Sequence, residues 1–397
     1  MIPVAEALNI LDSTLAPLKR SSERVILANS LGRVLSEDQI STLDLPPFNK
    51  SAMDGYAIGI GDDRDAYRVL GMIPAGSAPR ERFAAGTCFK VMTGAPIPEG
   101  TGKVIMVEDT IEEQSTVRIL RRRDQSNICE KGEDVSAGDR ILPAGTRLDA
   151  ADIANLVACG ICSAKCVPRP KVAVLSTGNE LVSSVDNIEP GKIIDTNGPL
   201  LESLALTFGM NVTRRGLVDD DAESTARWIE SALDISDIVL ASGGVSEGDF
   251  DTVCPALQAL GATIHFSRVA MKPGKPTVFA SLGEKVIFAL PGNPVSVHLT
   301  FHLFVLRAVS ILTSSVPLFR SFVLAMQCDW RRRNADRAQF VPCRLTHDGR
   351  IEPVVFHGSA HLAAISVTDG YAHVPAGVEE VREGEKVEFL AVKGLCK

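Results

Sequence analysis

The chain has 397 residues, which at roughly 150 residues per domain predicts two to four domains. Its formal net charge of −8 argues against a protein that binds DNA or RNA irrespective of sequence, because such proteins carry a basic balance or a strongly basic patch. Hydrophobic residues make up 45% and charged residues 23%, which excludes a largely disordered chain. Aromatic residues make up only 5%, so we expect aliphatic cores and no stacking platform for single-stranded nucleic acid.

The cysteine count and the apolar segments bear on where the protein works. Nine cysteines, an odd number spread over a long chain, do not fit a secreted disulfide framework. The first residues lack the basic and apolar regions of a signal peptide. The longest apolar stretch, Val295–Val316, contains His298, His302 and Arg307, which favours a buried core helix over a membrane span. We therefore expect a soluble, cytoplasmic protein with no membrane partner.

The first half of the chain predicts a helical segment followed by a β domain. Apolar residues recur at helical spacing through the first 40 residues, and a second short helix is expected over Val25–Leu31. Between residues 41 and 145, Gly and Pro punctuate the sequence every eight to twelve residues, which is typical of a small all-β domain. Its expected strands include residues 87–92, 103–108 and 116–120. Residues 149–160 predict a helix with Asp149 as its N-cap and Gly160 at its end.

The second half predicts an α/β domain and another β domain. Strands are expected at residues 171–175, 212–218, 237–241, 264–269, 278–281 and 285–290, and helices at 199–208, 222–233, 252–260 and 294–312. This alternation indicates a parallel, doubly wound sheet covered on both faces. Residues 317–397 contain short strands and turns typical of a small β barrel or sandwich. The predicted division is 1–40 with 146–167, then 41–145, 168–316 and 317–397.

The loops that follow the predicted parallel strands carry the candidate chemistry. Ligands of open α/β sheets bind beyond the carboxyl ends of the strands, so these loops should share one edge. Glycines in the segment Ser242-Gly243-Gly244 would let backbone N–H groups approach an anion. Lys272 and Lys275 would bind an oxyanion. Carboxylates that could bind Mg²⁺ occur at Glu180, Asp220, Asp249 and Asp251. Together they predict a site for a phosphorylated ligand with a divalent metal.

Each of these features also has a purely structural interpretation. The Ser-Gly-Gly segment alone is an ordinary turn, and Asp221 is best explained as the N-cap of the following helix. Cys159, Cys162 and Cys166 have metal-like spacing but lack a fourth ligand, which favours inert buried thiols. His298 and His302, four apart on an apolar helix, are best explained as packing or hydrogen-bonded residues. Only the convergence of several loops on one edge supports a functional site.

The motifs along the chain resemble those of the MoeA family of molybdopterin molybdenumtransferases, which includes the E domain of gephyrin. The most specific of these motifs in this chain are residues 51–57, Ser-Ala-Met-Asp-Gly-Tyr-Ala, and 272–276, Lys-Pro-Gly-Lys-Pro. Further motifs follow in family order at residues 92–100, 107–109, 132–134, 176–180, 195–197, 242–246 and 290–296. In the C-terminal domain, Arg337 keeps only the first arginine of a family pattern, and Ser359 fits its site. The resemblance covers nearly the whole chain.

This resemblance implies a fold and a reaction. The fold would combine α/β with all-β domains: a doubly wound, MogA-like central domain, a β domain inserted towards the N-terminus, a linking helical segment and a C-terminal β barrel. The reaction would be Mg²⁺-dependent insertion of molybdate into adenylylated molybdopterin, with release of AMP. The chain would form a homodimer in which Asp54 and Thr93 complete the other subunit's site. Partners would include the molybdopterin adenylyltransferase and acceptor molybdoenzymes.

The resemblance also assigns roles to individual residues. The implied catalytic residues are Asp54, Thr93, Glu180, Asp220, Asp251, Lys272 and Lys275. The implied substrate-binding residues are Ser242, Gly243, Gly244, Ser246, Pro276, Pro291, Asn293, Pro294, Ser296, Arg337 and Ser359. The implied metal ligands are Glu180, Asp220, Asp249 and Asp251.

Two other functions remain open at this point. The related molybdopterin adenylyltransferase resembles residues 168–316 alone and carries a Thr-Gly-Gly-Thr-Gly loop, whereas this chain has Ser-Gly-Gly-Val-Ser and two extra β domains. A gephyrin-like scaffold without catalysis is the alternative from another class. The acidic residues and lysines named above favour retained catalysis.

Overall fold

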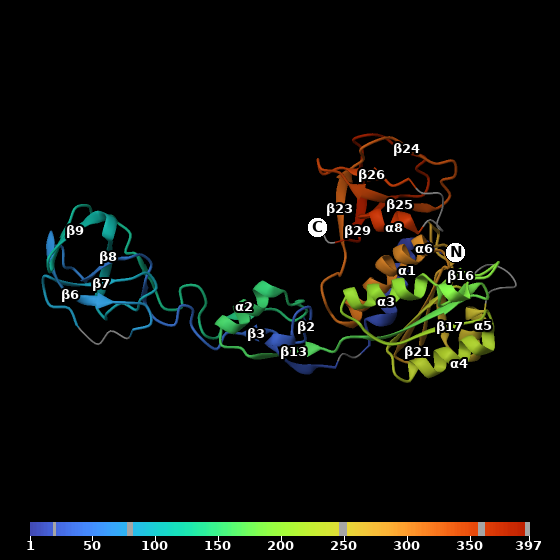
Figure 1. Ribbon diagram of the computed structural model, residues 1–397, viewed down its shortest axis with the longest axis horizontal. Coiled ribbons are helices and arrows are strands. Elements are labelled where there is room, and N and C mark those ends of the chain that lie inside the picture. The colour runs from blue at the N-terminus through green and yellow to red at the C-terminus, as the bar shows by residue number, and fades with distance from the viewer. Residues whose placement is uncertain (19–20, 78–81, 246–251, 356–361, 394–397) are drawn as a thin grey trace.

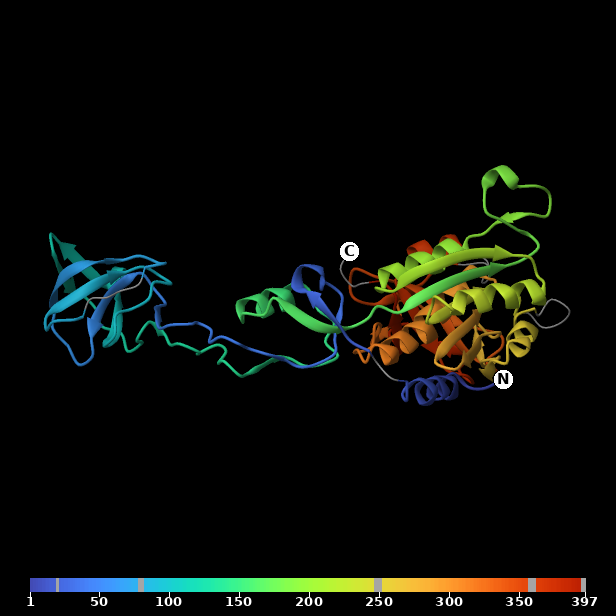
Figure 2. The same ribbon diagram turned by 90° about the horizontal axis from the view of Figure 1, so that it is seen from below.

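The chain is elongated, with three parts arranged along its length (Figures 1 and 2). The computed structural model describes residues 1–18, 21–77, 82–245, 252–355 and 362–393. A β domain occupies one end, a narrow neck follows, and the remaining elements form a body that contains the N-terminus. The predicted multidomain fold, with α/β and all-β parts, is confirmed.

The β domain is a six-stranded sheet that buries side chains on both faces. Its strand order is β8-β5-β7-β6-β10-β9, and β4 pairs with β11 beside it. In β5, Tyr56 and Ile58 point into one core cluster while Ala57 points into another, as the alternation of a strand requires. The elements are β4 Lys50–Ser51, β5 Gly55–Gly59, β6 Ala66–Ile73, β7 Thr87–Val91, β8 Thr101–Met106, η2 Val107–Asp109, β9 Thr110–Glu113, β10 Thr116–Ile119 and β11 Ile128–Cys129. The three strands expected here are confirmed to within two residues.

The neck, residues 21–40 and 140–167, is built from chain segments far apart in the sequence. Its sheet has the order β1-β13-β2, and β3 pairs with β12. The elements are β1 Glu23–Ile26, η1 Leu27–Asn29, β2 Val34–Leu35, β3 Gln39–Ile40, β12 Arg140–Leu142, α2 Ala150–Ala158 and β13 Ser163–Val167. The predicted cap of α2 is confirmed, because the Asp149 carboxylate accepts from the backbone N–H groups of Ala151 and Asp152.

The helix expected over Val25–Leu31 is wrong. Those residues form the end of β1 and a short 3-10 turn instead. The reason is tertiary: β1 pairs antiparallel with β13, with Val25 opposite Ala164. Such a distant partner overrides local helical spacing.

The N-terminal helix α1, Val4–Leu15, packs on the body rather than on the neck. Its buried residues Ala7, Leu11 and Leu15 belong to the core cluster of the body. Asp12 accepts two hydrogen bonds from Arg307, at 2.8 and 2.6 Å. This bidentate ion pair fixes α1 against the long helix at residues 294–312 of the body.

The body contains the predicted doubly wound α/β sheet. Its strand order is β17-β14-β18-β22-β21-β19. Val172 and Val174 of β14 face the core under α1, α3 and the long helix, while Ala173 and Leu175 face the core under α4 and α5. The elements are β14 Lys171–Thr177, α3 Asn197–Thr207, β17 Asn211–Val218, α4 Ala222–Leu233, β18 Ile238–Ser242, α5 Val253–Ala259, β19 Thr263–Phe266, β21 Val278–Leu282 and β22 Lys285–Leu290.

One edge of this sheet departs from the all-parallel expectation. Strands β17, β14, β18 and β22 are parallel, but β21 is antiparallel to β22 and β19 is antiparallel to β21. The reversal follows from a tight hairpin, in which Leu282 pairs with Lys285 and Gly283 has φ 59°. Because β19 is reversed twice, it runs in the same direction as the parallel strands. Its following loop therefore starts at the same edge as theirs.

A segment projects from the body between β14 and α3. It contains β15 Leu181–Val182, η3 Val185–Asn187 and β16 Ile193–Ile194, and Figure 2 shows it standing away from the sheet.

The apolar stretch near residue 300 is a buried core helix, as predicted. It consists of α6 Pro294–Thr300, η4 Phe301–Val305, which has π-helical turns, and α7 Leu306–Leu312. It is the one helix of the described chain that is long and apolar enough to cross a membrane, and 83% of it is buried in the body.

The C-terminal domain is a β structure packed on the body. Its main sheet has the order β20-β25-β27-β29-β23, with β26 beside β25 and a separate β24-β28 pair. The elements are β20 Met271–Lys272, β23 Arg320–Ala325, β24 Trp330–Arg331, β25 Ala338–Leu345, β26 Ile351–Pro353, α8 Ala363–Val367, β27 Gly370–Val374, β28 Glu380–Val381 and β29 Lys386–Ala391. Strand β20 comes from the loop after β19, so this sheet ties the α/β part to the C-terminal domain.

Candidate functional site

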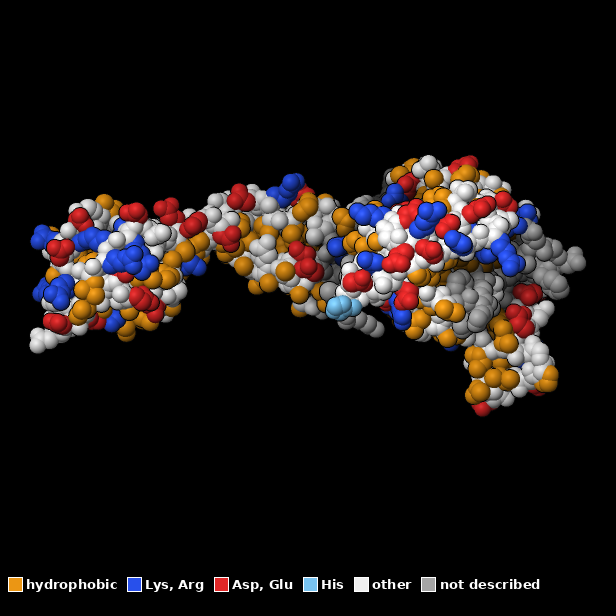
Figure 3. All heavy atoms as spheres, turned by 90° about the horizontal axis from the view of Figure 1, so that it is seen from above, with side chains coloured by type: hydrophobic (Ala, Val, Ile, Leu, Met, Phe, Trp, Pro, Cys, Tyr) orange, Lys and Arg blue, Asp and Glu red, His pale blue; other side chains and the backbone are white. Residues whose placement is uncertain are grey.

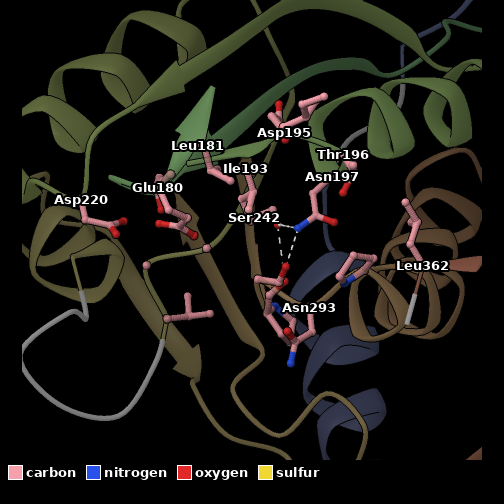
Figure 4. A pocket seen from close by; sticks show the side chains of 18 of the residues that line it. Glu180, Leu181, Ile193, Asp195, Thr196, Asn197, Asp220, Ser242, Asn293 and Leu362 are labelled. Carbon is pink, nitrogen blue, oxygen red and sulfur yellow. Dashed lines mark hydrogen bonds between the residues drawn. The ribbon is translucent and has the colours of Figure 1, made fainter. Parts of the chain in front are cut away.

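A cleft of about 820 Å³ opens at the carboxyl edge of the parallel strands (Figure 4). Its volume is in the range of small-molecule sites. The lining includes residues from the loops after β14, β17, β18 and β22, from the start of α3 and from the projecting segment. The predicted site residues that line it are Glu180, Asp220, Ser242, Gly243, Gly244, Pro276, Pro291, Asn293 and Pro294. The loops that the sequence pattern predicted to share one edge of the sheet thus line one cleft.

The Ser-Gly-Gly turn can be built only with glycines. Gly243 has φ 94° and Gly244 has φ 61°, in the left-handed region that glycine favours. A Cβ on Gly243 would overlap the carbonyl oxygen of Thr177, and one on Gly244 would lie 2.6 Å from Thr252 Oγ1. The two glycines therefore let β18 turn closely against β14 and expose backbone to the cleft.

Asn197 at the start of α3 holds two walls of the cleft together. Its Nδ2 donates to Ser242 Oγ at 2.9 Å and to the Gly292 carbonyl at 2.6 Å (dashed in Figure 4). Nearby, Asp195 accepts from Ser176 Oγ and from the Gly198 N–H, both at 2.9 Å. These bonds fix the helix start beside the turn.

Three oxygen atoms that line the cleft are buried and have no hydrogen-bond partner in the described part of the chain. They are Thr177 Oγ1, Asn197 Oδ1 and Asp220 Oδ1. Buried polar atoms are nearly always satisfied, so orphaned atoms that gather in one cleft indicate that a ligand, ion or water completes them.

The acidic residues lie at one end of this cleft. The Asp220 N–H donates to Asn179 Oδ1 at 3.0 Å, which places the loop after β17 beside the loop after β14. Figure 4 shows Asp220 pointing towards Glu180. No group of three or more His, Cys, Asp or Glu that could bind a metal occurs within the described ranges. Two carboxylates with an unsatisfied oxygen do fit Mg²⁺, which is often bound by one or two carboxylates plus substrate phosphates.

The predicted basic residues lie outside the described cleft lining. Lys272 is exposed in β20, and Arg337 beside it donates to the Met271 carbonyl at 3.4 Å. Lys275 is partly buried in the same loop, and Ser296 is buried in α6. Lys272 and Arg337 thus lie together where β20 meets β25, next to the loop that contributes Pro276 to the cleft.

Several predicted residues lie outside the described residues. These are Ser246, Asp249, Asp251 and Ser359.

Asp54 and Thr93 form a polar pair in the β domain, at the far end of the molecule from the cleft (Figures 1 and 2). The Thr93 N–H and Oγ1 both donate to Asp54 Oδ1, at 2.6 and 2.7 Å. These two bonds, the backbone bond first, hold the pKa of Asp54 below its ordinary value. Within one chain this pair does not reach the cleft.

The sequence-based prediction missed several residues that line the cleft. These are Thr177, Lys192, Ile193, Asp195, Thr196, Asn197 and Leu362. Lys192 is the one lysine or arginine among the described lining residues, and its Nζ donates to the Asn179 carbonyl at 2.6 Å. The motif Asp195-Thr196-Asn197 carried part of the family resemblance and could have indicated them.

The two histidines are buried and hydrogen-bonded, as predicted, and two of the three clustered cysteines are buried. His298 Nδ1 lies 2.8 Å from Tyr371 Oη, and His302 Nδ1 lies 2.7 Å from the His298 carbonyl. Burial lowers the pKa of His298 to about 2 and that of His302 to about 4. Cys159 and Cys166 are buried free thiols, as expected, whereas Cys162 is exposed.

Comparison with known proteins agrees with this architecture. The MoeA N-terminal region (domain I and II) matches residues 2–160, a probable molybdopterin binding domain matches residues 173–310, and the MoeA C-terminal region (domain IV) matches residues 325–392. The molybdopterin molybdenumtransferase of Staphylococcus epidermidis is 34% identical, over 92% of this chain and 90% of that protein. The corresponding Staphylococcus aureus enzyme is 32% identical, over 98% and 95%. The crystal structure of the molybdopterin biosynthesis MoeA protein from Pyrococcus horikoshii superposes with a TM-score of 0.86 and 31% identity, covering 98% of this chain and 100% of that one.

The fold defines a multidomain α/β protein with a cleft at the carboxyl edge of its central sheet. The chain belongs to the MoeA family of molybdopterin molybdenumtransferases, enzymes of molybdenum cofactor biosynthesis. The predicted resemblance and enzyme class are confirmed. Matches to both the N-terminal and C-terminal MoeA regions favour this assignment over the adenylyltransferase alternative, which resembles the central domain alone.

Proposed function

We propose that the chain inserts molybdate into adenylylated molybdopterin in a Mg²⁺-dependent reaction that releases AMP, and that the cleft binds the adenylylated pterin. The observation that carries this proposal is the group of three orphaned oxygen atoms around a glycine turn in one cleft. A phosphorylated pterin bound with a metal would satisfy that arrangement, because carboxylate and amide oxygens coordinate a metal or accept from pterin N–H groups, and the glycine turn lets a phosphate approach the backbone.

The residues would divide the work by position. Asp220 and Glu180 would hold Mg²⁺, with Asp249 and Asp251 as the further predicted ligands. Bound Mg²⁺ supplies positive charge that neutralises phosphate oxygens. The Ser242-Gly243-Gly244 turn would bind the pyrophosphate bridge through its backbone, and Asn197 would hold that turn in place through its bonds to Ser242 and Gly292. Lys272, Lys275 and Arg337 would hold the molybdate oxyanion by charge. The protein thus mainly positions two anions and stabilises their charge.

The proposal includes a homodimer in which Asp54 and Thr93 complete the cleft of the partner subunit. Two observations support it. The polar pair lies at the end of the molecule opposite its own cleft. Large apolar side chains are exposed along the neck and the projecting segment, including Ile26, Leu31 and Val157 of the neck and Val185 and Ile193 of the segment (Figure 3). Exposed apolar surface of this kind marks protein contacts.

The cellular setting completes the proposal. Molybdopterin adenylyltransferase would supply the substrate, and acceptor molybdoenzymes would take the product. A cytoplasmic location fits these partners and the buried position of the helix Pro294–Leu312.

The test is cofactor formation in vitro from adenylylated molybdopterin, molybdate and Mg²⁺, measured by AMP release and by activation of an apo-molybdoenzyme. We expect turnover that requires all three components. Tight binding of the adenylylated pterin without AMP release would instead identify a scaffold.

A further inference from the structure

A small cavity lies where the neck joins the body. Its lining combines three arginines, Arg33, Arg147 and Arg169, and the glycines Gly32 and Gly209 with apolar side chains such as Phe208 and Leu318. The arginines come from the neck and from the connection between β13 and β14, whereas Gly209 follows α3 of the body. The cavity therefore lies between the neck and the body. The orientation of the neck on the body determines where the β domain lies.

Arg33 is almost completely buried beside this cavity. Its side chain is 10% exposed, and its Nη2 donates to Glu23 and, at 3.0 Å, to the Val167 carbonyl. Its Nε is buried and has no partner among the described residues. One donor of a buried guanidinium is thus unsatisfied at the junction, an arrangement that folded proteins normally avoid.

Arg147 lies between the two glycines. A Cβ built on Gly209 would lie 3.4 Å from Arg147 Nη2, and one on Gly32 would lie 3.7 Å from the same atom. The guanidinium is partly buried, and within the described ranges it forms no hydrogen bond or ion pair. Burial and the nearby charge of Arg169 lower the pKa of Arg147. Arg169 itself has only a long contact, 3.5 Å from Nη2 to the Leu31 carbonyl.

The charges at this junction do not balance. Glu23 neutralises Arg33, but no carboxylate of the described chain pairs with Arg147 or Arg169. A partly buried, unpaired cation is unfavourable, and guanidinium groups bind tetrahedral oxyanions in bidentate geometry. We propose that this junction is a binding site for an inorganic tetrahedral oxyanion, of the sulfate or phosphate class, which is distinct from the cleft and fixes the neck against the body.

The geometry defines how such an anion would bind. The cavity has room for about one water-sized group, at about 20 Å³, so one anion oxygen would enter beside Arg147 and Arg33 Nε. The remaining oxygens would lie at its mouth, within reach of Arg169. The glycines leave that approach open, because a side chain at Gly32 or Gly209 would project towards Arg147.

The test is anion binding to the full-length chain, measured by calorimetry and by thermal unfolding with sulfate, phosphate or molybdate against chloride at equal ionic strength. We expect saturable binding by the wild-type chain, with a rise in Tm on the order of 2–4 °C. Arg147→Gln should lose the binding and the rise, and Arg169→Gln should weaken both. Arg118→Gln, which changes an exposed arginine of the β domain, should keep both.

Two further comparisons separate an anion site at the junction from binding in the cleft and from a purely structural role of the arginines. Lys275→Gln should keep the rise in Tm with sulfate, because Lys275 belongs to the proposed catalytic group and not to the junction. In buffer of low anion content, Arg147→Gln should unfold at or above the wild-type Tm, and in saturating sulfate it should unfold below it. A merely structural arginine would lower the Tm in both conditions.

Equal sulfate binding by Arg147→Gln and the wild type would overturn the proposal. So would loss of dimerisation by that variant without any anion binding, which would assign the arginines to a subunit contact.

Discussion

The cleft in the body and the polar pair in the β domain differ in how completely one chain builds them. The cleft is formed by several loops, which hydrogen bonds such as those of Asn197 hold in place. Three buried oxygen atoms of its lining residues have no hydrogen-bond partner in the described part of the chain. Asp54 and Thr93 are hydrogen-bonded to each other on an exposed surface, and neither of them lines the cleft. One region is therefore a candidate site formed within a single chain, and the other is a preformed polar pair away from that cleft. Substitutions in each region can show whether the two belong to the same reaction.

The largest expected effect is at the acidic end of the cleft. Asp220→Asn should lower cofactor formation by roughly 10²–10³-fold, because the site would lose a charge that holds Mg²⁺ against phosphate. Asp221→Ser is the matched control: Asp221 caps α4 through the Ser224 N–H at 2.7 Å, and serine preserves such a cap. Steady-state AMP release against Mg²⁺ concentration measures both. Full Mg²⁺-dependent activity of Asp220→Asn would remove the assignment.

The glycine turn should be nearly as sensitive. Gly243→Ala combines a positive φ with an overlap on Thr177, and should destabilise the body by roughly 3 kcal/mol while weakening adenylylated pterin binding. Gly261→Ala is the control, since Gly261 also has positive φ, 71°, but has open space around its Cβ position. It should cost about 1 kcal/mol and leave binding unchanged. Urea unfolding and ligand titration distinguish the two, and similar losses for both variants would show that the close approach to Thr177 has no role.

The body should also respond to pH through its buried histidines. Burial keeps His302 neutral, with its pKa lowered to about 4, whereas in the unfolded chain the pKa is near 6.5. Between these values the unfolded chain binds more protons, so stability is complete above pH 6.5 and falls as the pH drops towards 4. Relative to His302→Gln, the wild-type chain should lose up to about 3 kcal/mol over that window. Urea unfolding followed by tryptophan fluorescence at several pH values measures this, and parallel pH profiles would contradict it.

Elements defined by local sequence could be predicted, whereas elements defined by a distant strand partner could not. Strictly periodic elements of the body were predicted well: α4 was expected at residues 222–233 and lies there. The edge of the sheet at which the loops meet could also be predicted, because the loops after parallel strands all begin at the carboxyl ends of those strands. The neck was predicted poorly, because β1 is determined by its distant partner β13. Lys272 was placed near the cleft but forms a strand of the C-terminal sheet, and a local sequence pattern does not reveal that pairing.

The smallest expected effect, and the one that joins the two regions, concerns Asp54. Asp54→Asn should slow cofactor formation by roughly tenfold, as loss of a positioning group does, and leave adenylylated pterin binding to the cleft of the same chain intact. If Asp54 acts in the partner's cleft, mixing Asp54→Asn chains with Asp220→Asn chains should restore activity. A dimer with one chain of each kind has one cleft formed entirely from intact residues, so random exchange should return about a quarter of the wild-type sites. Mixing Asp54→Asn with itself, or Asp220→Asn with itself, supplies the baseline. Recovery above that baseline requires the two ends of the molecule to meet across subunits. Mixed dimers without recovery would place Asp54 in the same site as Asp220 of its own chain, or would show that the β-domain pair has no part in the reaction.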